Sequence, residues 1–201
     1  MIRIVLATRN KGKLKEISTI MSGLPVEMLS AFDFPYLPEV DEDGETLKEN
    51  ALKKARALHS ATHLPALADD SGLEVLALDM RPGVLSARYA GENVSYEENN
   101  EKLLLELGNV PPSRRSAQFR CVAAFVGKGV EKTTTGICPG RIIDGPRGEG
   151  GFGYDPLFVP DGYDKTFAEL PLRVKNTISH RAKAFGMMKK FLAGYLIETE
   201  R

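Results

Sequence analysis

The sequence has few cysteines, no excess of either charge and no long apolar run. Cys121 and Cys138 are its only cysteines, too few for a disulfide scaffold, so we expect reduced thiols and a cytoplasmic protein. Lysine plus arginine and aspartate plus glutamate each total 27, so the net charge is zero. This balance argues against a nucleic-acid-binding module and against binding to a membrane surface, both of which require basic patches. A phosphorylated small ligand is compatible with it, because such a ligand needs only a local basic pocket.

The apolar segments are short. No run reaches the roughly 18 residues of a membrane-spanning helix, so we expect no membrane span. The run Ile2–Ala7 is also too short for the core of a signal peptide and is typical of a buried strand. No repeat or long linker divides the 201 residues. We therefore expect one domain over residues 1–201, as a single body or as two lobes around a cleft.

Helical and extended patterns alternate along the chain. The expected strands are Ile2–Ala7, Leu64–Ala68, Ser116–Val126 and Glu131–Cys138, the last two as an antiparallel hairpin. Helices are expected after Gly12, after the capping boxes Thr46–Glu49 and Ser95–Glu98, and after Ser179. Asp69–Gly72 is expected to end the second strand, and Leu73–Leu78 to form a further apolar element. The alternation predicts an α/β fold with a mixed sheet.

A polar, basic loop follows the first expected strand and opens the first expected helix. It consists of Thr8, Arg9, Asn10, Lys11, Gly12 and Lys13. Backbone N–H groups at a helix N-terminus attract phosphate, and the basic side chains add positive charge. The loop matches neither common glycine-rich nucleotide fingerprint. An ordinary turn between strand and helix, with solvated lysines, is the alternative interpretation.

The acidic pair Asp69 and Asp70 follows an apolar segment, where ligands bind in open α/β sheets. Two adjacent carboxylates repel each other and favour a bound cation or proton. Mg²⁺ prefers carboxylate oxygens together with water and substrate phosphates, and the acidic run Asp41, Glu42 and Asp43 could provide a second ligand. A polar loop with aspartate–serine–glycine turn chemistry explains the same residues without a metal.

Two further segments could contact a flat ligand. Phe152, Gly153, Tyr154 and Asp155 combine aromatic rings for stacking, glycine for close approach and a carboxylate that accepts hydrogen bonds. Lys175, His180 and Arg181 form a local basic cluster whose donors suit a keto oxygen on a base. A tight turn with buried aromatic residues and a solvated helix start are the respective alternatives.

Taken together, the motifs closely resemble one family, the inosine/xanthosine triphosphate pyrophosphatases. The resemblance extends over almost the whole chain, in a single order. The matching segments are Leu6–Lys13, Glu42–Ala51, Lys54–Arg56, Ala68–Leu73, Ser86–Gly91, Gly150–Pro156 and Ile178–Arg181. The resemblance implies an elongated mixed β-sheet flanked by helices, two lobes around a central nucleotide-binding cleft, and a homodimer. It also implies Mg²⁺-dependent cleavage of ITP, dITP and XTP to the nucleoside monophosphate and pyrophosphate.

The resemblance implies a role for each matching residue. Glu42 and Asp70 would hold Mg²⁺, and Asp70 would activate the attacking water. Thr8 to Lys13 would hold the triphosphate with the help of Lys54. Ser71 would touch the nucleotide. The base and sugar would be held by Phe152, Gly153, Tyr154, Asp155, Lys175, His180 and Arg181.

Several points stay open at this stage. The proton acceptor could be Asp69 or Asp70, and a pyrophosphatase for pyrimidine nucleotides or a non-catalytic nucleotide sensor are alternative functions. Arg9 stands where many relatives have glycine and adds a charge near the expected phosphates. Leu47 stands where phenylalanine is common, which we interpret as a packing exchange.

Overall fold

A computed structural model describes residues 2–34, 36–37 and 40–199 of the chain. Its strands form one six-stranded sheet with the order β2-β1-β3-β4-β5-β6 in the described residues. The strands are β1 (Ile2–Leu6), β2 (Val26–Ser30), β3 (Ala66–Val75), β4 (Ser116–Gly127), β5 (Val130–Ile142) and β6 (Phe158–Pro160). The helices are α1 (Lys11–Met21), α2 (Leu47–Thr62), α3 (Tyr96–Glu106), α4 (Leu172–Ile178) and α5 (His180–Thr199). β1 pairs in parallel with β2 and β3, and β5 pairs antiparallel with β6, so the predicted mixed α/β sheet is confirmed.

The chain divides into two compact units. Unit 1 contains the residues up to Asp70, then Cys121–Gly136 and the chain from Arg181 onward. Unit 2 contains Ser71–Arg120 and Ile137–His180. Cys121 and Cys138 are buried and form no disulfide, as expected. No helix among the described residues is long and apolar enough to cross a membrane.

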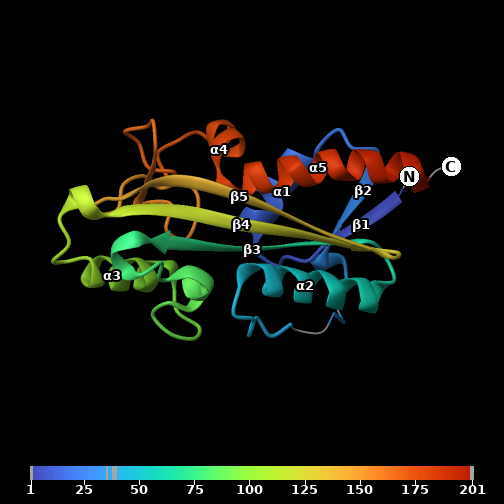
Figure 1. The fold of residues 1–201 in the computed structure, drawn as a ribbon, viewed down its shortest axis with the longest axis horizontal. Helices are drawn as coiled ribbons and strands as arrows, with labels where there is room; N and C mark the ends of the chain where they lie inside the picture. Colours follow the sequence, from blue (N-terminus) through green and yellow to red (C-terminus); the bar gives the residue numbers. More distant parts are fainter. Residues whose placement is uncertain (1, 35, 38–39, 200–201) are drawn as a thin grey trace. The chain divides into compact units, whose positions relative to one another are not determined.

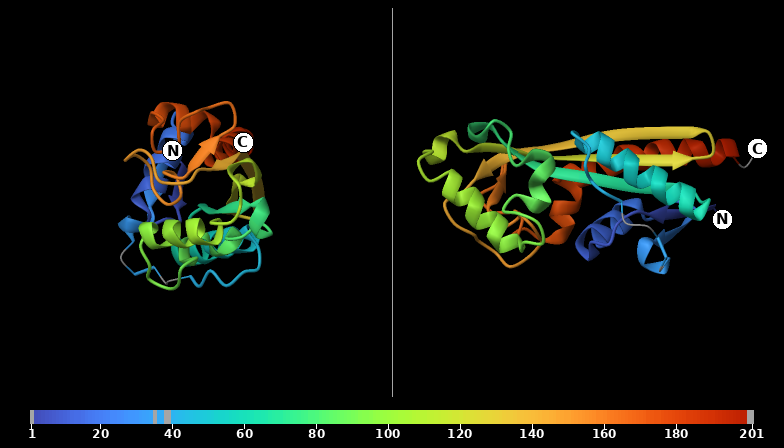
Figure 2. Two further views of the ribbon diagram at one scale, coloured as in Figure 1. Left: turned by 90° about the vertical axis from the view of Figure 1, so that its left-hand side faces the viewer. Right: turned by 90° about the horizontal axis from the view of Figure 1, so that it is seen from below.

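In unit 1, helices cover both faces of β1. Ile4 and Leu6 pack with Ile17 of α1 and Phe185 of α5, whereas Val5 packs with Leu58 of α2. Alternate strand residues point to opposite faces, so one short apolar run serves two helical layers. Figure 1 and the right-hand view of Figure 2 show α2 on the face of these strands opposite to α1 and α5. This sandwich holds the carboxyl end of β1 between helix layers.

The capping boxes begin their helices as predicted. Thr46 Oγ1 accepts a hydrogen bond from Glu49 N at 3.2 Å, and Glu49 Oε2 accepts one from Thr46 N at 3.0 Å. Ser95 and Glu98 make the same exchange at the start of α3. Each box satisfies backbone donors that a helix otherwise leaves without partners, which fixes where the helix begins.

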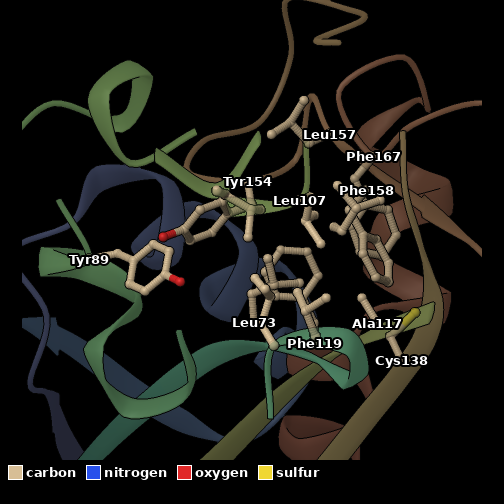
Figure 3. Packing of buried hydrophobic residues seen from close by; sticks show 14 residues of the cluster. Leu73, Tyr89, Leu107, Ala117, Phe119, Cys138, Tyr154, Leu157, Phe158 and Phe167 are labelled. Carbon is tan, nitrogen blue, oxygen red and sulfur yellow. The ribbon is translucent and has the colours of Figure 1, made fainter. Parts of the chain in front are cut away.

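Unit 2 has its own aromatic core. Phe119 of β4 lies 4.7 Å from Phe158 of β6, measured between ring centroids, and Phe167 stacks nearby. Figure 3 shows these rings together with Leu73, Leu107 and Tyr154 in one cluster. β4 and β5 are sheet neighbours joined through Lys128 and Gly129, which confirms the predicted hairpin. This core packs against the strands and loops of unit 2 that contain the candidate residues Phe152–Asp155.

The strand predicted at Leu64–Ala68 is confirmed from Ala66 onward, but its predicted end at Asp69–Gly72 is wrong. β3 starts at Ala66 and continues through Asp69–Gly72 to Val75, so the aspartate–serine–glycine stretch is a strand and not a turn. Gly72 has a packing role within it: a Cβ at this position would lie 2.2 Å from the carbonyl oxygen of Gly83. Gly72, a residue type that is common in turns, thus allows another backbone segment to approach closely inside a strand.

Two strands and one α-helix of the described residues were not predicted, namely β2, β6 and α4. β2 and β6 have five and three residues, and α4 has seven. Such short segments provide too few residues for a clear period of two or 3.6. They form because neighbouring strands and helices offer them partners, which a local sequence pattern does not reveal.

The sheet edge in unit 2 gives a stability prediction. A Cβ at Gly140 would lie 2.3 Å from the carbonyl oxygen of Val159 and 2.6 Å from Phe158 Cζ, whereas nothing lies within 4 Å of a Cβ at Gly145. We expect Gly140→Ala to lower the free energy of unfolding by about 1–3 kcal/mol, because backbone atoms must move apart. Gly145→Ala is the matched control and should leave it almost unchanged. Equal denaturant midpoints for both variants would contradict the packing described for β5 and β6.

Candidate functional site

The Thr8–Lys13 loop has the predicted strand–loop–helix geometry. Asn10 caps α1, with its Oδ1 accepting a hydrogen bond from Lys13 N at 3.0 Å. Thr8 Oγ1 accepts a hydrogen bond from Asn10 N at 3.1 Å. These contacts leave the basic side chains of the loop grouped around the N-terminus of α1, where the helix dipole favours an anion. Lys11 and Gly12 are the first two residues of the helix.

Asp69 and Asp70 point to opposite faces of the sheet, because successive residues of a strand alternate. On one face, Asp70 accepts hydrogen bonds from α2, from Lys54 Nζ at 3.0 Å and Asn50 Nδ2 at 3.3 Å. On the other, Asp69 lies 3.1 Å from Lys13 Nζ of α1 and 3.3 Å from Arg181 Nη2 of α5. The two neighbouring carboxylates therefore form direct ion pairs with different cations on the two faces of the strand.

Glu42 and Asp70 converge on one ammonium group. Lys54 Nζ lies 2.8 Å from Glu42 Oε2 and 3.0 Å from Asp70 Oδ1. Burial raises the pKa of the Asp70 carboxyl group to about 6, against the opposing charges of Lys54 and Lys13. Burial acts to raise the pKa of Glu42, but the charge and hydrogen bond of Lys54, a hydrogen bond with Asp70 and the charge of Lys13 together outweigh it and lower that pKa. Because the carboxylates of Glu42 and Asp70 share only one ammonium group, additional positive charge is favourable beside them.

The carboxylates of Glu42 and Asp70 suit a divalent cation with a partly open coordination shell. The described residues contain no cluster of three or more histidine, cysteine, aspartate or glutamate side chains that could hold a metal. Mg²⁺ is commonly bound through one or two carboxylates, with waters and substrate phosphates completing the shell. The donor set therefore fits Mg²⁺ that binds together with a phosphorylated substrate.

Arg181 belongs to a buried ion network. Its Nη1 lies 2.6 Å from Glu16 Oε2 of α1, and its guanidinium also contacts Asp69. Burial acts to raise the pKa of Asp69, but the charges of Lys13, Arg181 and Lys54 outweigh it and hold that pKa well below its usual range. Glu16 was missed by sequence reasoning, since its partner Arg181 is 165 positions away and no local pattern links the two.

A cavity of about 330 Å³ opens in unit 1, lined in part by Thr8, Glu42 and Lys54. Cationic and acidic groups line one part of it and apolar side chains the rest. The lining residues are Ala7, Thr8, Arg9, Ala31, Leu37, Val40, Asp41, Glu42, Lys54, Ala57 and Leu58. Its volume lies at the lower end of the range for small-molecule sites. The structure thus places Thr8 and Arg9 of the loop, Glu42 and Lys54 around one cavity.

In unit 2, the aromatic glycine loop (Gly148–Pro156) is held by one carboxylate. Asp155 Oδ2 accepts hydrogen bonds from Phe152 N at 2.9 Å and from Lys175 Nζ at 2.5 Å. Lys175 Nζ also lies 4.8 Å from the centre of the Phe152 ring. Gly151 and Gly153 adopt φ values of +74° and +62°, a region that favours glycine. The predicted residues Phe152, Gly153, Asp155 and Lys175 thus form one compact group.

Other predicted residues of unit 2 lie in its interior. Tyr154 is 4% exposed, and its hydroxyl donates to the carbonyl oxygen of Ser86 at 2.9 Å. The His180 ring stacks on Phe119 with 4.7 Å between ring centroids. Ser71 follows Asp70 within β3 and is partly buried. Tyr154 and His180 therefore have structural contacts, and their predicted contacts with substrate stay predictions.

The fold and the residues of unit 1 define a class: an α/β protein in which a helix N-terminus that favours anions lies near a pair of carboxylates that suits Mg²⁺. The model of the Ham1 family matches residues 4–191. The chain belongs to this family.

Its relatives share the whole length of the chain. A dITP/XTP pyrophosphatase from Geobacter sulfurreducens is 56% identical over 199 residues, covering 98% of this chain and 100% of that protein. One from Desulforamulus reducens is 48% identical, covering 99% and 100%. The solved structure of a HAM1 protein from Coxiella burnetii has a TM-score of 0.88 and 41% identity, with 96% of this chain and 100% of that chain covered.

The buried ion network predicts an unequal cost for two arginine substitutions. Arg181→Met leaves the buried carboxylates of Glu16 and Asp69 without their shared cation, and we expect it to lower the free energy of unfolding by about 3–5 kcal/mol. Arg56→Met is the matched control, because Arg56 pairs with Glu131 at an exposed position and its loss should change stability little. Urea unfolding of both variants measures the difference. Similar losses would show that the network is not held as described.

Proposed function

We propose that this protein hydrolyses non-standard purine nucleoside triphosphates, namely ITP, dITP and XTP, to the monophosphate and pyrophosphate. The observation that carries the proposal is the convergence of Glu42, Lys54 and Asp70 next to the Thr8–Lys13 loop. End-to-end identity of 56% to a dITP/XTP pyrophosphatase supports the same activity. Removal of such nucleotides from the pool would keep them out of DNA and RNA.

Mg²⁺ is the proposed cofactor, with Glu42 and Asp70 as its protein ligands. Bound there, it would neutralise phosphate charge and polarise the scissile phosphoanhydride. Lys13, Lys54 and the N–H groups at the start of α1 would stabilise the pyrophosphate as it gathers negative charge. Arg9 would add a further cation on the same side.

Asp70, and not Asp69, is the proposed proton acceptor. Lys13 and Arg181 stabilise the ionised form of Asp69, which makes it a weak base. Asp70 faces Glu42 and Lys54 on the side of the proposed metal, and bound Mg²⁺ would keep its carboxylate ionised and able to accept a proton from a metal-associated water. A water oxygen would attack the α-phosphorus, its proton would pass to Asp70, and the bond between the α-phosphorus and the bridging oxygen would break.

The base would be selected through its keto oxygen. Hypoxanthine and xanthine present an acceptor at C6, where adenine presents an amino donor. Donors from His180, Arg181 or the backbone would leave that amino group without a partner, and a buried unpaired polar group costs about 1–3 kcal/mol. The ring of Phe152 would stack on the base, with Gly153, Asp155 and Lys175 shaping its surroundings.

Cell location and assembly complete the proposal. The family resemblance supports a cytoplasmic homodimer, with two lobes around a nucleotide-binding cleft. It also supports a substrate contact by Ser71. Sedimentation of the purified protein checks the dimer: a monomer at micromolar concentration would exclude it.

Product identification tests the reaction. With Mg²⁺ and dITP we expect dIMP and pyrophosphate in equal amounts, and no turnover after chelation of the metal with EDTA. XTP should be cleaved in the same way, and ATP and UTP much more slowly. Formation of dIDP and phosphate would refute the cleavage position. A preference for UTP would refute the purine-keto specificity.

The assignment of Asp70 predicts the behaviour of two asparagine variants. Asp70→Asn removes the proposed proton acceptor and a metal ligand, so we expect kcat for dITP to fall at least about a hundredfold, while nucleotide binding stays measurable. Asp43→Asn is the control, because Asp43 is 73% exposed and pairs with Lys53 at the surface. It should keep wild-type turnover. Full activity of Asp70→Asn would show that the reaction centre lies elsewhere.

A further inference from the structure

One face of α3 lies against the aromatic glycine loop. Tyr96 is the first residue of α3, and Asn100 follows one turn later, so the two side chains share a face of the helix. Asn100 Nδ2 donates a hydrogen bond to the carbonyl oxygen of Gly153 at 3.1 Å. The ring of Tyr96 lies 6.2 Å from that of Phe152, between centroids, at an interplanar angle of 40°. Both contacts fall on consecutive residues of the loop.

α3 is a fixed support for these contacts. Its first turn is held by the capping box of Ser95 and Glu98. Asn99 accepts a hydrogen bond from Ala90 N at 2.8 Å and donates one to the carbonyl oxygen of Ala87 at 3.1 Å. Leu103 is fully buried in the core of unit 2 (Figure 3 shows this core). These contacts tie α3 to neighbouring segments independently of the loop.

The loop has several contacts with the rest of unit 2, and the contact at Gly153 comes from α3. Asp155 accepts hydrogen bonds from Phe152 N and Lys175 Nζ, Gly150 N donates to the carbonyl oxygen of Ala168, and the Tyr154 hydroxyl donates to that of Ser86. Gly153 has a φ of +62° and no side chain to hold it, so the carbonyl contact with Asn100 restricts a residue with unusual conformational freedom. The Tyr96 ring restricts the orientation of the Phe152 ring through direct contact. Lys175 Nζ also lies near the Phe152 ring.

We propose that Tyr96 and Asn100 are positioning residues for base binding, which act through Phe152 and Gly153. The inference rests on the proposed function, in which this loop holds the purine. Asn100 sets the backbone of the loop and Tyr96 sets the plane of the stacking ring. A base must be stacked and hydrogen-bonded at the same time, so a small displacement of the loop weakens base binding. The phosphate contacts belong to unit 1 and are not affected.

The test compares a ligand that has a base with one that lacks it. The proteins are wild type, Asn100→Leu, Asn100→Asp, Tyr96→Ala and Tyr96→Phe, with Glu101→Leu as the control at the exposed neighbouring position. The ligands are dIMP and inorganic pyrophosphate with Mg²⁺, and calorimetry gives each Kd. Asn100→Asp keeps the shape and removes the donor. Asn100→Leu also removes Oδ1, a buried oxygen without a hydrogen-bond partner among the described residues.

We expect Kd for dIMP to rise about three- to tenfold in Asn100→Leu, Asn100→Asp and Tyr96→Ala, the range for one lost hydrogen bond or ring contact. Tyr96→Phe and Glu101→Leu should bind dIMP like the wild type. Kd for pyrophosphate should stay unchanged in all of them. In turnover of dITP, KM should rise more than kcat falls, whereas a merely structural role would lower the melting temperature and leave the ratio of the two Kd values unchanged.

The outcomes separate this inference from the proposed function. Unchanged dIMP binding in Asn100→Asp and Tyr96→Ala overturns the inference, as does an equal loss for dIMP and pyrophosphate. If wild-type protein binds dIMP but does not cleave dITP, the proposed function fails while the binding data still decide on Tyr96 and Asn100. If wild-type protein binds pyrophosphate but not dIMP, the inference fails, and product identification from dITP still decides on the proposed function.

Discussion

The candidate chemistry depends on the extended backbone of β3 at Asp69 and Asp70. In a strand, adjacent side chains leave the sheet on opposite faces, so two carboxylates that would repel each other are separated without a break in the chain. Both are buried, and a buried charge is costly unless it is paired. Each therefore has its own cations: Lys13 and Arg181 on one face, Lys54 on the other. These cations belong to α1, α5 and α2, so the ion pairs connect three helices to β3.

The same arrangement gives two identical groups different proton affinities. Asp69 faces two cations and has a lowered pKa, whereas Asp70 is buried near a second carboxylate and has a raised one. The difference arises from the environment on each face and not from the residue type. Unit 2 also contains a buried ion pair, between Asp155 and Lys175. Asp155 accepts a further hydrogen bond from Phe152 N, so this pair helps to fix the conformation of the aromatic glycine loop.

Features encoded within a few residues could be predicted from the sequence. The strand–loop–helix at Thr8–Lys13, both capping boxes and the β4–β5 hairpin each depend on local propensity, and all are present. The continuity of β3 could not be predicted, because glycine after aspartate and serine is typical of a turn. The reason for glycine at position 72 is the close approach of the Gly83 carbonyl oxygen, a tertiary contact that no local pattern indicates. The pairing of Glu16 with Arg181 was hidden for the same reason. The family resemblance named Arg181 but could not reveal the carboxylates that hold it.

Charge balance favours one face of β3 for the metal. Lys13 and Arg181 match Asp69 and Glu16, so that network is already neutral and would gain nothing from a further cation. On the other face, Lys54 faces the carboxylates of Glu42 and Asp70, which leaves one negative charge in excess when both are ionised. A divalent cation there would turn the excess into one positive charge, which suits an incoming triphosphate. The electrostatics therefore favour Asp70 as the ligand of the proposed metal and leave Asp69 as the ion-pair partner of Lys13.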